Sequence, residues 1–180
     1  SEDNIKFIKM NAKNMGFKNE SFDMVCLSNS LHHLTDINSI LEEMKRVLKN
    51  KGFFVINEMF SDGQENARKT YVDMHHFGAE IDRMMGRIHY QTFTKEKIKE
   101  IVINKSLDID KSIVYRQSSE ELTSEETINY FIDAIDKKIE FIKDKKEYEK
   151  FKDKAKNLKK KILETGLQVP DHMLIIANKN

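Results

Sequence analysis

Histidines are the side chains of this sequence best suited to chemistry. His32 and His33 are adjacent, His75 and His76 form a second adjacent pair, and His89 stands alone. An imidazole can exchange a proton near neutral pH, and it can also bind a metal ion. Neighbouring histidines rarely point to one ion, however, and no carboxylate pattern accompanies these pairs. The sequence therefore predicts no metal site, and it assigns no catalytic residue.

The overall composition excludes several classes of protein. The 180 residues include 31 basic and 30 acidic side chains, which give a formal net charge of +1. A chain so close to neutrality is not built to coat nucleic acid. The longest apolar runs, such as Phe53–Ile56, are too short to cross a bilayer, so we expect no membrane partner. The single cysteine, Cys26, rules out an internal disulfide and fits a cytoplasmic location.

The first two thirds of the chain predict an α/β protein. Apolar runs at Phe22–Leu27 and Phe53–Glu58 are typical of buried strands. Between them, Asp36–Leu48 carries apolar residues at three- and four-residue spacing, as in a helix that Thr35 or Asp36 can cap. Strand, helix and strand with short joints form a βαβ unit, so these two strands should be adjacent and parallel. We also expect strands at Ile5–Met10, Leu107–Arg116 and His172–Ala177, and helices within Gly63–Gly86 and Thr94–Asn104.

The segment Ser118–Thr165 has a different character. Thr123–Glu126 resembles a capping box, and isoleucines then recur every three or four residues from Ile128 to Ile142. A second apolar stripe runs from Tyr148 to Ile162. Two antiparallel helices joined by a short turn account for both stripes.

Three motifs in order resemble the class I S-adenosylmethionine-dependent methyltransferases. Met15–Val25 is similar to the family's turn and fourth strand, and Leu31–Leu34 matches the loop after that strand. Leu41–Gly52 resembles the family's Leu-x-Glu-x-x-Arg-Val-Leu-Lys-Pro-Gly-Gly, although Asn50 and Lys51 replace the proline and first glycine. The resemblance implies a Rossmann-like, mostly parallel sheet, here incomplete, with the family's strands three to seven. It divides the chain into a partial methyltransferase core (1–117), a helical hairpin insertion (118–166) and the final core strand (167–180).

The resemblance also suggests where S-adenosylmethionine would bind. Asn11 and Ala12 follow the strand expected at Ile5–Met10, where the family contacts adenine; the alternative is an ordinary turn. Ser28, Asn29 and Ser30 follow the next strand, and His33 would line the pocket. For these residues the alternative is a strand-ending turn. The predicted cofactor-binding residues are thus Asn11, Ala12, Ser28, Asn29, Ser30 and His33.

One part of the family pattern is missing. The six glycines never cluster, so the acidic-x-Gly-x-Gly-x-Gly loop that holds the cofactor is absent. We therefore expect a methyltransferase chain, acting on a small molecule, that is inactive alone and binds S-adenosylmethionine weakly or not at all. The alternative is a non-enzymatic fragment that self-associates, as a homodimer, through its helices or an open sheet edge.

Overall fold

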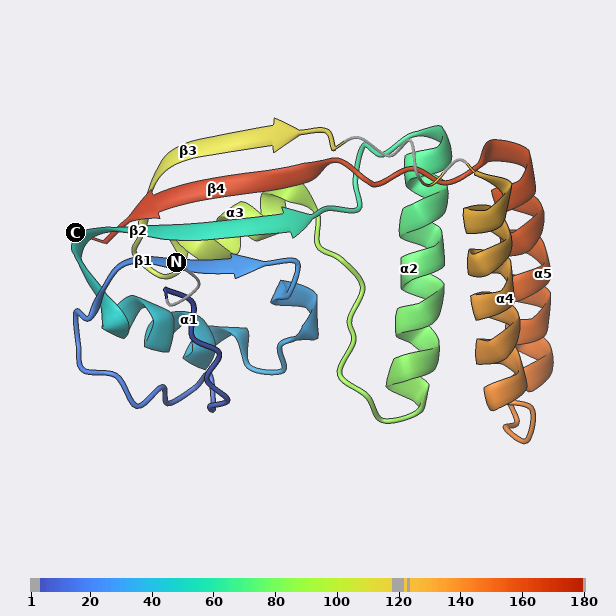
Figure 1. Cartoon of the computed structure of the whole chain (residues 1–180), viewed down its shortest axis with the longest axis horizontal. Coiled ribbons are helices and arrows are strands. Elements are labelled where there is room, and N and C mark those ends of the chain that lie inside the picture. The colour runs from blue at the N-terminus through green and yellow to red at the C-terminus, as the bar shows by residue number, and fades with distance from the viewer. Residues whose placement is uncertain (1–3, 118–121, 123, 180) are drawn as a thin grey trace.

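The computed structural model describes residues 4–117, 122 and 124–179, which form a sheet half and a helical half (Figure 1). Its strands are β1 (Phe22–Ser28), β2 (Leu48–Met59), β3 (Asp108–Tyr115) and β4 (His172–Asn178). Its helices are α1 (Ile37–Val47), α2 (Asn66–Met84), α3 (Lys95–Ile103), α4 (Glu125–Phe141) and α5 (Tyr148–Thr165), with a short 3-10 turn at Leu31–His33. No helix in this part of the chain combines the length and the apolar character that a membrane span needs.

The sheet confirms the predicted βαβ unit. Its strand order is β1-β2-β4-β3, with β1 parallel to β2 and β4 antiparallel to both of its neighbours. In the middle of the sheet Phe54 lies opposite Val25 on one side and Ala177 on the other. The strand expected at Leu107–Arg116 forms at the edge of the sheet as β3, and the last strand forms as β4. The fold is therefore α/β with a Rossmann-like arrangement of strands.

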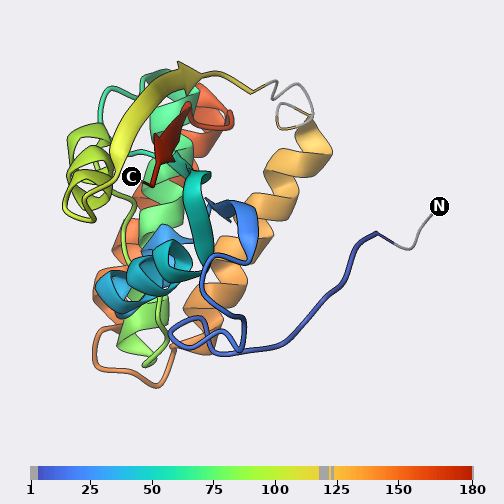
Figure 2. The ribbon, with the colours of Figure 1, turned by 90° about the vertical axis from the view of Figure 1, so that its left-hand side faces the viewer.

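Helices α1 and α3 lie on the same face of this sheet (Figure 2). The carboxylate of Asp36 caps α1 by accepting a hydrogen bond from the Ser39 N–H at 3.1 Å. Thr94 caps α3 in the same way through the Lys97 N–H. Both helices bury one apolar stripe against the sheet, and the resulting core contains Leu41, Met44, Phe54, Ile56, Ile98, Val102 and Ile175.

An ion pair on α1 holds the loop that precedes β1. The Glu43 side chain is buried and accepts hydrogen bonds from Arg46 Nε and, at 2.7 Å, from the Met15 N–H. Arg46 also donates to the Met15 carbonyl and to the Asn19 side chain. Residues of the Met15–Val25 motif are thus fixed to the helix that follows the motif.

The strand expected at Ile5–Met10 does not form. These residues belong to no strand, and the segment leads away from the body of the molecule (Figure 2). The Phe7 side chain is 97% exposed. A strand is stable only when a neighbour accepts its backbone hydrogen bonds. The free edge of β1 has no partner strand among the described residues. The alternating apolar and charged residues of Ile5–Met10 were therefore not enough to form a strand.

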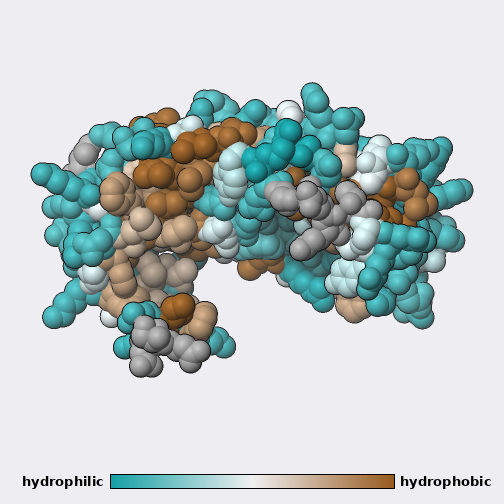
Figure 3. Space-filling model, turned by 45° about the horizontal axis from the view of Figure 1, so that its top comes forward, coloured by the Kyte–Doolittle hydropathy of each residue, from teal (hydrophilic) through white to brown (hydrophobic). Residues whose placement is uncertain are grey.

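The sheet face opposite α1 and α3 carries exposed apolar side chains. Met24 is 55% exposed, Phe53 46% and Ile113 43%, and all three lie on neighbouring parts of this face. Figure 3 shows apolar residues gathered over the sheet half, whereas the helical half is mostly hydrophilic. The sheet is therefore packed on one face only among the residues that the structure describes.

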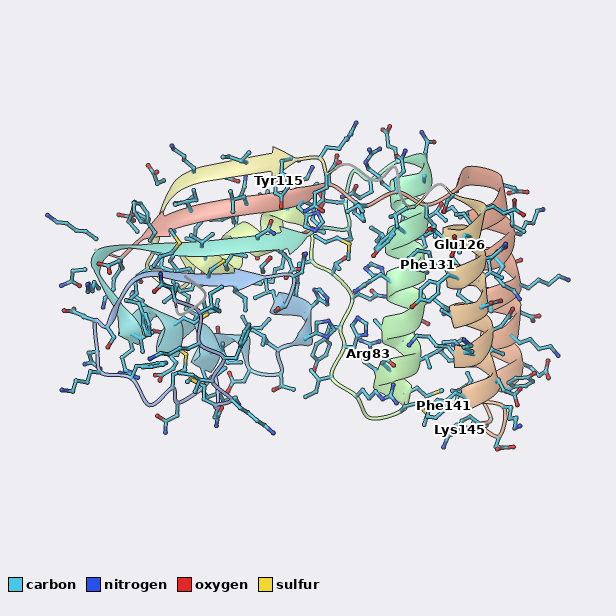
Figure 4. The ribbon with its side chains drawn as sticks, in the orientation of Figure 1. Arg83, Tyr115, Glu126, Phe131, Phe141 and Lys145 are labelled. Carbon is cyan, nitrogen blue, oxygen red and sulfur yellow. The ribbon has the colours of Figure 1, made fainter. Side chains whose placement is uncertain are left out.

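The helical half has a hydrophobic core of its own. The predicted hairpin forms as α4 and α5, but α2 also packs against it, since Phe77 and Ile81 join the same buried cluster as Ile139 and Ile162. Phe131 points from α4 toward α2 (Figure 4), where its ring lies 6.2 Å from that of Tyr71. The first turn of α4 begins one residue later than the predicted capping box at Thr123–Glu126 implies. Ser124 caps α4 through the Thr127 N–H, and Thr123 lies outside the described residues.

Candidate functional site

A cavity of about 390 Å³ lies where the sheet half meets the helical half. Asn29 and Met59 contribute to it from the carboxyl ends of β1 and β2, and Tyr71 and His75 contribute from α2. In open α/β sheets, ligands bind beyond the carboxyl ends of parallel strands. The other lining residues are His32, His33, Gln117, Val169, Pro170 and His172.

A tight turn after β1 presents its backbone to this cavity. Asn29 adopts a φ of 44°, in the left-handed region that asparagine tolerates better than most residues. Its N–H donates to the Asn57 carbonyl at 2.8 Å, and its side-chain oxygen accepts from the Met59 N–H at 3.2 Å. The hydroxyl of Ser30 donates to the Ser28 carbonyl at 2.7 Å. The predicted residues Ser28, Asn29 and Ser30 therefore lie together at the expected end of the strand.

The buried Glu58 at the end of β2 fixes the next part of the site. One carboxylate oxygen accepts from the Leu31 N–H at 2.8 Å, and the other lies 3.0 Å from His32 Nδ1. Both side chains of the pair are almost fully buried. Since the carboxylate accepts, His32 Nδ1 carries the proton and Nε2 keeps its lone pair when the ring is neutral.

Four histidine rings gather beside the cavity. His33 Nδ1 lies 3.4 Å from the Ile88 carbonyl, and His89 Nδ1 lies 2.8 Å from the Asp82 carboxylate. His89 Nε2 is 3.2 Å from His75 Nε2. Burial, together with the neighbouring His32 and His89, lowers the pKa of His75 to about 3. Burial and His32 likewise lower the pKa of His33, so both rings are neutral at pH 7.

His76 takes no part in this group. Its Nε2 accepts from the Thr92 N–H at 3.1 Å and from the Thr92 hydroxyl at 2.8 Å. The two adjacent pairs therefore behave differently: His32 and His33 stay together, whereas His75 and His76 point to different surroundings.

Asn11 and Ala12 lie in an exposed turn. The side-chain oxygen of Asn11 accepts from the Lys13 N–H at 3.0 Å, and its carbonyl accepts from Asn14. Lys13 in turn forms an ion pair with Asp36. The adenine contact expected of Asn11 and Ala12 stays a prediction.

Sequence reasoning missed several residues of the site. Glu58 and Asp82 orient two of the histidines, and His172 lies against Tyr115 with 5.8 Å between ring centroids. Tyr115 donates to the Asn57 side chain at 2.9 Å. Of these residues, only Glu58 could have been recognised from the sequence, because its carboxylate ends an otherwise apolar strand. Asp82 and His172 are brought in by tertiary packing, which no local pattern reports.

Comparisons with known proteins show similarity to methyltransferases. Residues 1–56 match the family model described as a methyltransferase domain. The ubiquinone/menaquinone biosynthesis C-methyltransferase UbiE of Rickettsia prowazekii is 39% identical over 74 residues. That match takes in 41% of this chain and 29% of the relative, so the chain matches under a third of the relative's length.

Solved structures match almost the whole chain, although at low sequence identity. A Bacillus halodurans protein described as a methyltransferase has a TM-score of 0.54 at 17% identity, covering 97% of this chain and 78% of its own. A SAM-dependent methyltransferase from Methanosarcina mazei has a TM-score of 0.52 at 16% identity, covering 94% and 65%. Likenesses at such identities concern the fold, whereas the match over residues 1–56 concerns the sequence. The chain is thus similar to a methyltransferase domain in sequence over residues 1–56 and to methyltransferases in fold over most of its length.

Proposed function

We propose that this chain forms the acceptor side of a methyltransferase that uses S-adenosylmethionine and acts on a small molecule. The cavity beyond β1 and β2 carries the proposal, because it lies where α/β proteins bind ligands. Its volume of about 390 Å³ lies within the range for small-molecule sites. The relatives named UbiE are C-methyltransferases of quinone biosynthesis, which favours a small organic acceptor here too.

Of the proposed cofactor residues, Asn29 and His33 line this cavity. Ser28, Asn29, Ser30 and His33 would face the methionine part of the cofactor, and the turn at Asn11 and Ala12 would face its adenine. S-adenosylmethionine supplies an activated methyl group, so the protein's task is to align the acceptor and exclude water. A general base is needed only if the acceptor must lose a proton.

The 180 residues contain no glycine-rich loop to hold the cofactor's carboxylate end. Two neutral hydrogen bonds to the cofactor would contribute about 1–3 kcal/mol to the free energy of binding. Ordering a loop and immobilising the ligand costs several kcal/mol, so binding is unfavourable. We therefore propose that the chain alone neither binds S-adenosylmethionine at micromolar concentration nor transfers methyl groups. We also propose the division into 1–117, 118–166 and 167–180, with α2 packed on the hairpin.

Two measurements test the proposal. Isothermal titration of the 180-residue chain with S-adenosylhomocysteine should give no one-site binding at micromolar concentration. Binding in that range would show that the chain holds the cofactor without a glycine loop. The encoding gene should carry an acidic-x-Gly-x-Gly-x-Gly run upstream of Ser1, and its absence there would contradict the proposed methyltransferase.

A second candidate function is self-association without catalysis. The open edge of β1 and the apolar side chains Met24, Phe53 and Ile113 on the uncovered sheet face favour it. The oligomeric state in solution decides this point.

A further inference from the structure

We propose that His32, His33 and His89 form a binding site for one divalent transition-metal ion, with Zn²⁺ as the representative. One ring nitrogen from each histidine lies within 4.8 Å of those of the other two. The ring centroids of His32 and His33 are 4.3 Å apart, and those of His33 and His89 are 4.4 Å apart. Metal binding needs neither S-adenosylmethionine nor a methyl acceptor, so it can be measured without them, although His33 is also a proposed cofactor residue.

In each of the three rings Nδ1 has a protein oxygen as its partner, so Nε2 is the nitrogen that can bind an ion, although His89 Nε2 also contacts His75 Nε2. His32 Nδ1 faces Glu58, His33 Nδ1 faces the Ile88 carbonyl, and His89 Nδ1 faces Asp82. Histidines that bind metals nearly always donate their second N–H to a carboxylate or a backbone carbonyl, which fixes the ring and raises its basicity. Nε2 of all three rings is thus the ligand atom.

The charges around the rings suit a dication. Glu58 and Asp82 contact two of the three rings. Although burial raises the pKa of Asp82, the hydrogen bond from His89 and the charge of Lys138 hold it below its ordinary value. Asp82 also pairs with Lys138 and Arg87, whereas Glu58 forms an ion pair with no lysine or arginine in the part of the chain that the structure describes. Nitrogen ligands with carboxylates behind them are typical of zinc rather than of magnesium or calcium.

His75 supplies a candidate fourth nitrogen. Its Nε2 lies 3.2 Å from His89 Nε2. Two nitrogens bound at ordinary distances to a tetrahedral zinc ion are about 3.3 Å apart. The His75 Nδ1 is buried and has no hydrogen-bond partner among the described residues, and the ring lies against those of His32 and His89. Since His32, His33 and His75 also line the cavity, the ion would face the cavity.

Two features of the structure bear on the sequence argument against a metal site, which itself stays a prediction. The 3-10 turn at Leu31–His33 brings the adjacent rings of His32 and His33 to the same cluster. The carboxylates do exist, but Glu58 and Asp82 come from β2 and α2 rather than from a local motif. A spacing rule could not detect ligands contributed by three separate segments.

The test uses the 180-residue chain, free of any polyhistidine tag and treated with a chelator. Calorimetric titration with Zn²⁺ should show one ion per chain, and Co²⁺ should give the visible absorption of a tetrahedral site. His33→Gln removes a ligand from an exposed position, so the variant should fold and bind Zn²⁺ at least about 10-fold more weakly. His89→Gln should have the same effect.

The matched control is His76→Gln, which changes a nearby histidine that bonds to Thr92 instead. Its Zn²⁺ affinity should stay within about twofold of the unmodified chain, because His76 contributes no ligand. Asp82→Asn tests a positioning residue, since it should weaken binding about 10–100-fold while one ion per chain still binds. Circular dichroism checks that each variant is folded.

Absence of Zn²⁺ binding by the unmodified chain would overturn the proposal. Equal affinity in the unmodified chain, His33→Gln and His89→Gln would also overturn it, because the ion would then bind elsewhere. Neither result bears on methyl transfer, since no cofactor is present in these measurements.

Discussion

The carboxylate of Glu58 joins two strand ends, because it accepts from the Leu31 N–H at 2.8 Å and lies 3.0 Å from His32 Nδ1. Glu58 belongs to β2, whereas Leu31 and His32 follow β1. This one buried side chain therefore fixes the turn that lines the cavity.

Glu58→Ala should lower the free energy of unfolding by about 1–3 kcal/mol, since two buried donors lose their acceptor. Urea unfolding followed by circular dichroism measures the change. Glu100→Ala is the control, because Glu100 and its ion-pair partner Lys97 are both about half exposed. The control variant should lower the free energy of unfolding by less than about 1 kcal/mol. Equal costs for the two variants would show that Glu58 does not hold the turn.

The helical half offers a test with two adjacent residues. Ile162 is 1% exposed and Leu163 is 68% exposed, both on α5. Ile162→Ala should lower the free energy of unfolding by about 2–5 kcal/mol, because it opens a cavity in the hydrophobic core of the helical half. Leu163→Ala should change this free energy by no more than about 0.5 kcal/mol. Thermal unfolding of both variants distinguishes them. Similar losses would mean that the packing of α5 against α2 is not as described.

His76 should make the fold sensitive to acid. Burial and the charge of Lys69 lower the pKa of His76 below its ordinary value of 6.5. The unfolded chain then binds this proton more readily than the folded chain below about pH 6.5. The contribution of His76 to stability is complete above that pH and is lost as the pH falls below it.

The measurement compares thermal unfolding of the unmodified chain and His76→Gln from pH 7.5 to pH 5, with a chelator present. Glutamine keeps an oxygen that can accept from the Thr92 N–H but does not titrate in this range. The variant should therefore lose less stability on acidification than the unmodified chain. Parallel curves would exclude His76 as a source of the acid sensitivity.

The uncovered sheet face should make the chain associate at high concentration. Met24 and Phe53 lie opposite each other in the β1–β2 register and are both about half exposed. Light scattering at increasing concentration should show dimers or larger species, and Met24→Lys should shift the onset to higher concentration. Lys49→Ala, at a charged exposed position, serves as the control. A monomer at every concentration would remove the second candidate function.

Much of the fold was open to prediction from local patterns. The apolar runs at Phe22–Leu27 and Phe53–Glu58 and the stripe of Asp36–Leu48 specify their elements strongly, because each buries one face against a neighbour present in the chain. Ile5–Met10 carries an equally regular pattern and forms no strand. Its neighbours in a sheet would have to come from outside the described residues, and a pattern does not show whether a neighbour is there.

The candidate site was less predictable than the fold. Asn29 and His33, which line the cavity, could be placed there because they follow a strand that the sequence specifies well. The cofactor contacts of Ser28, Asn29, Ser30 and His33 stay a prediction. The grouping of His75 and His89 with His32 depends on how α2 and the segment after it lie against the turn, which is a tertiary relationship. The role of Asp82 depends on the same packing.

The cavity takes its walls from two separately packed bodies. Asn29 and Met59 belong to the sheet half, whereas Tyr71 and His75 belong to the helical half, and each half has its own hydrophobic cluster. A rigid-body rotation of one half can widen or narrow the cavity without disrupting either cluster. Such a rotation would have to be absorbed by all four connections between the halves, which lie before and after α2, before α4 and after α5. Any molecule that contacts both walls would favour the orientation in which both contacts form.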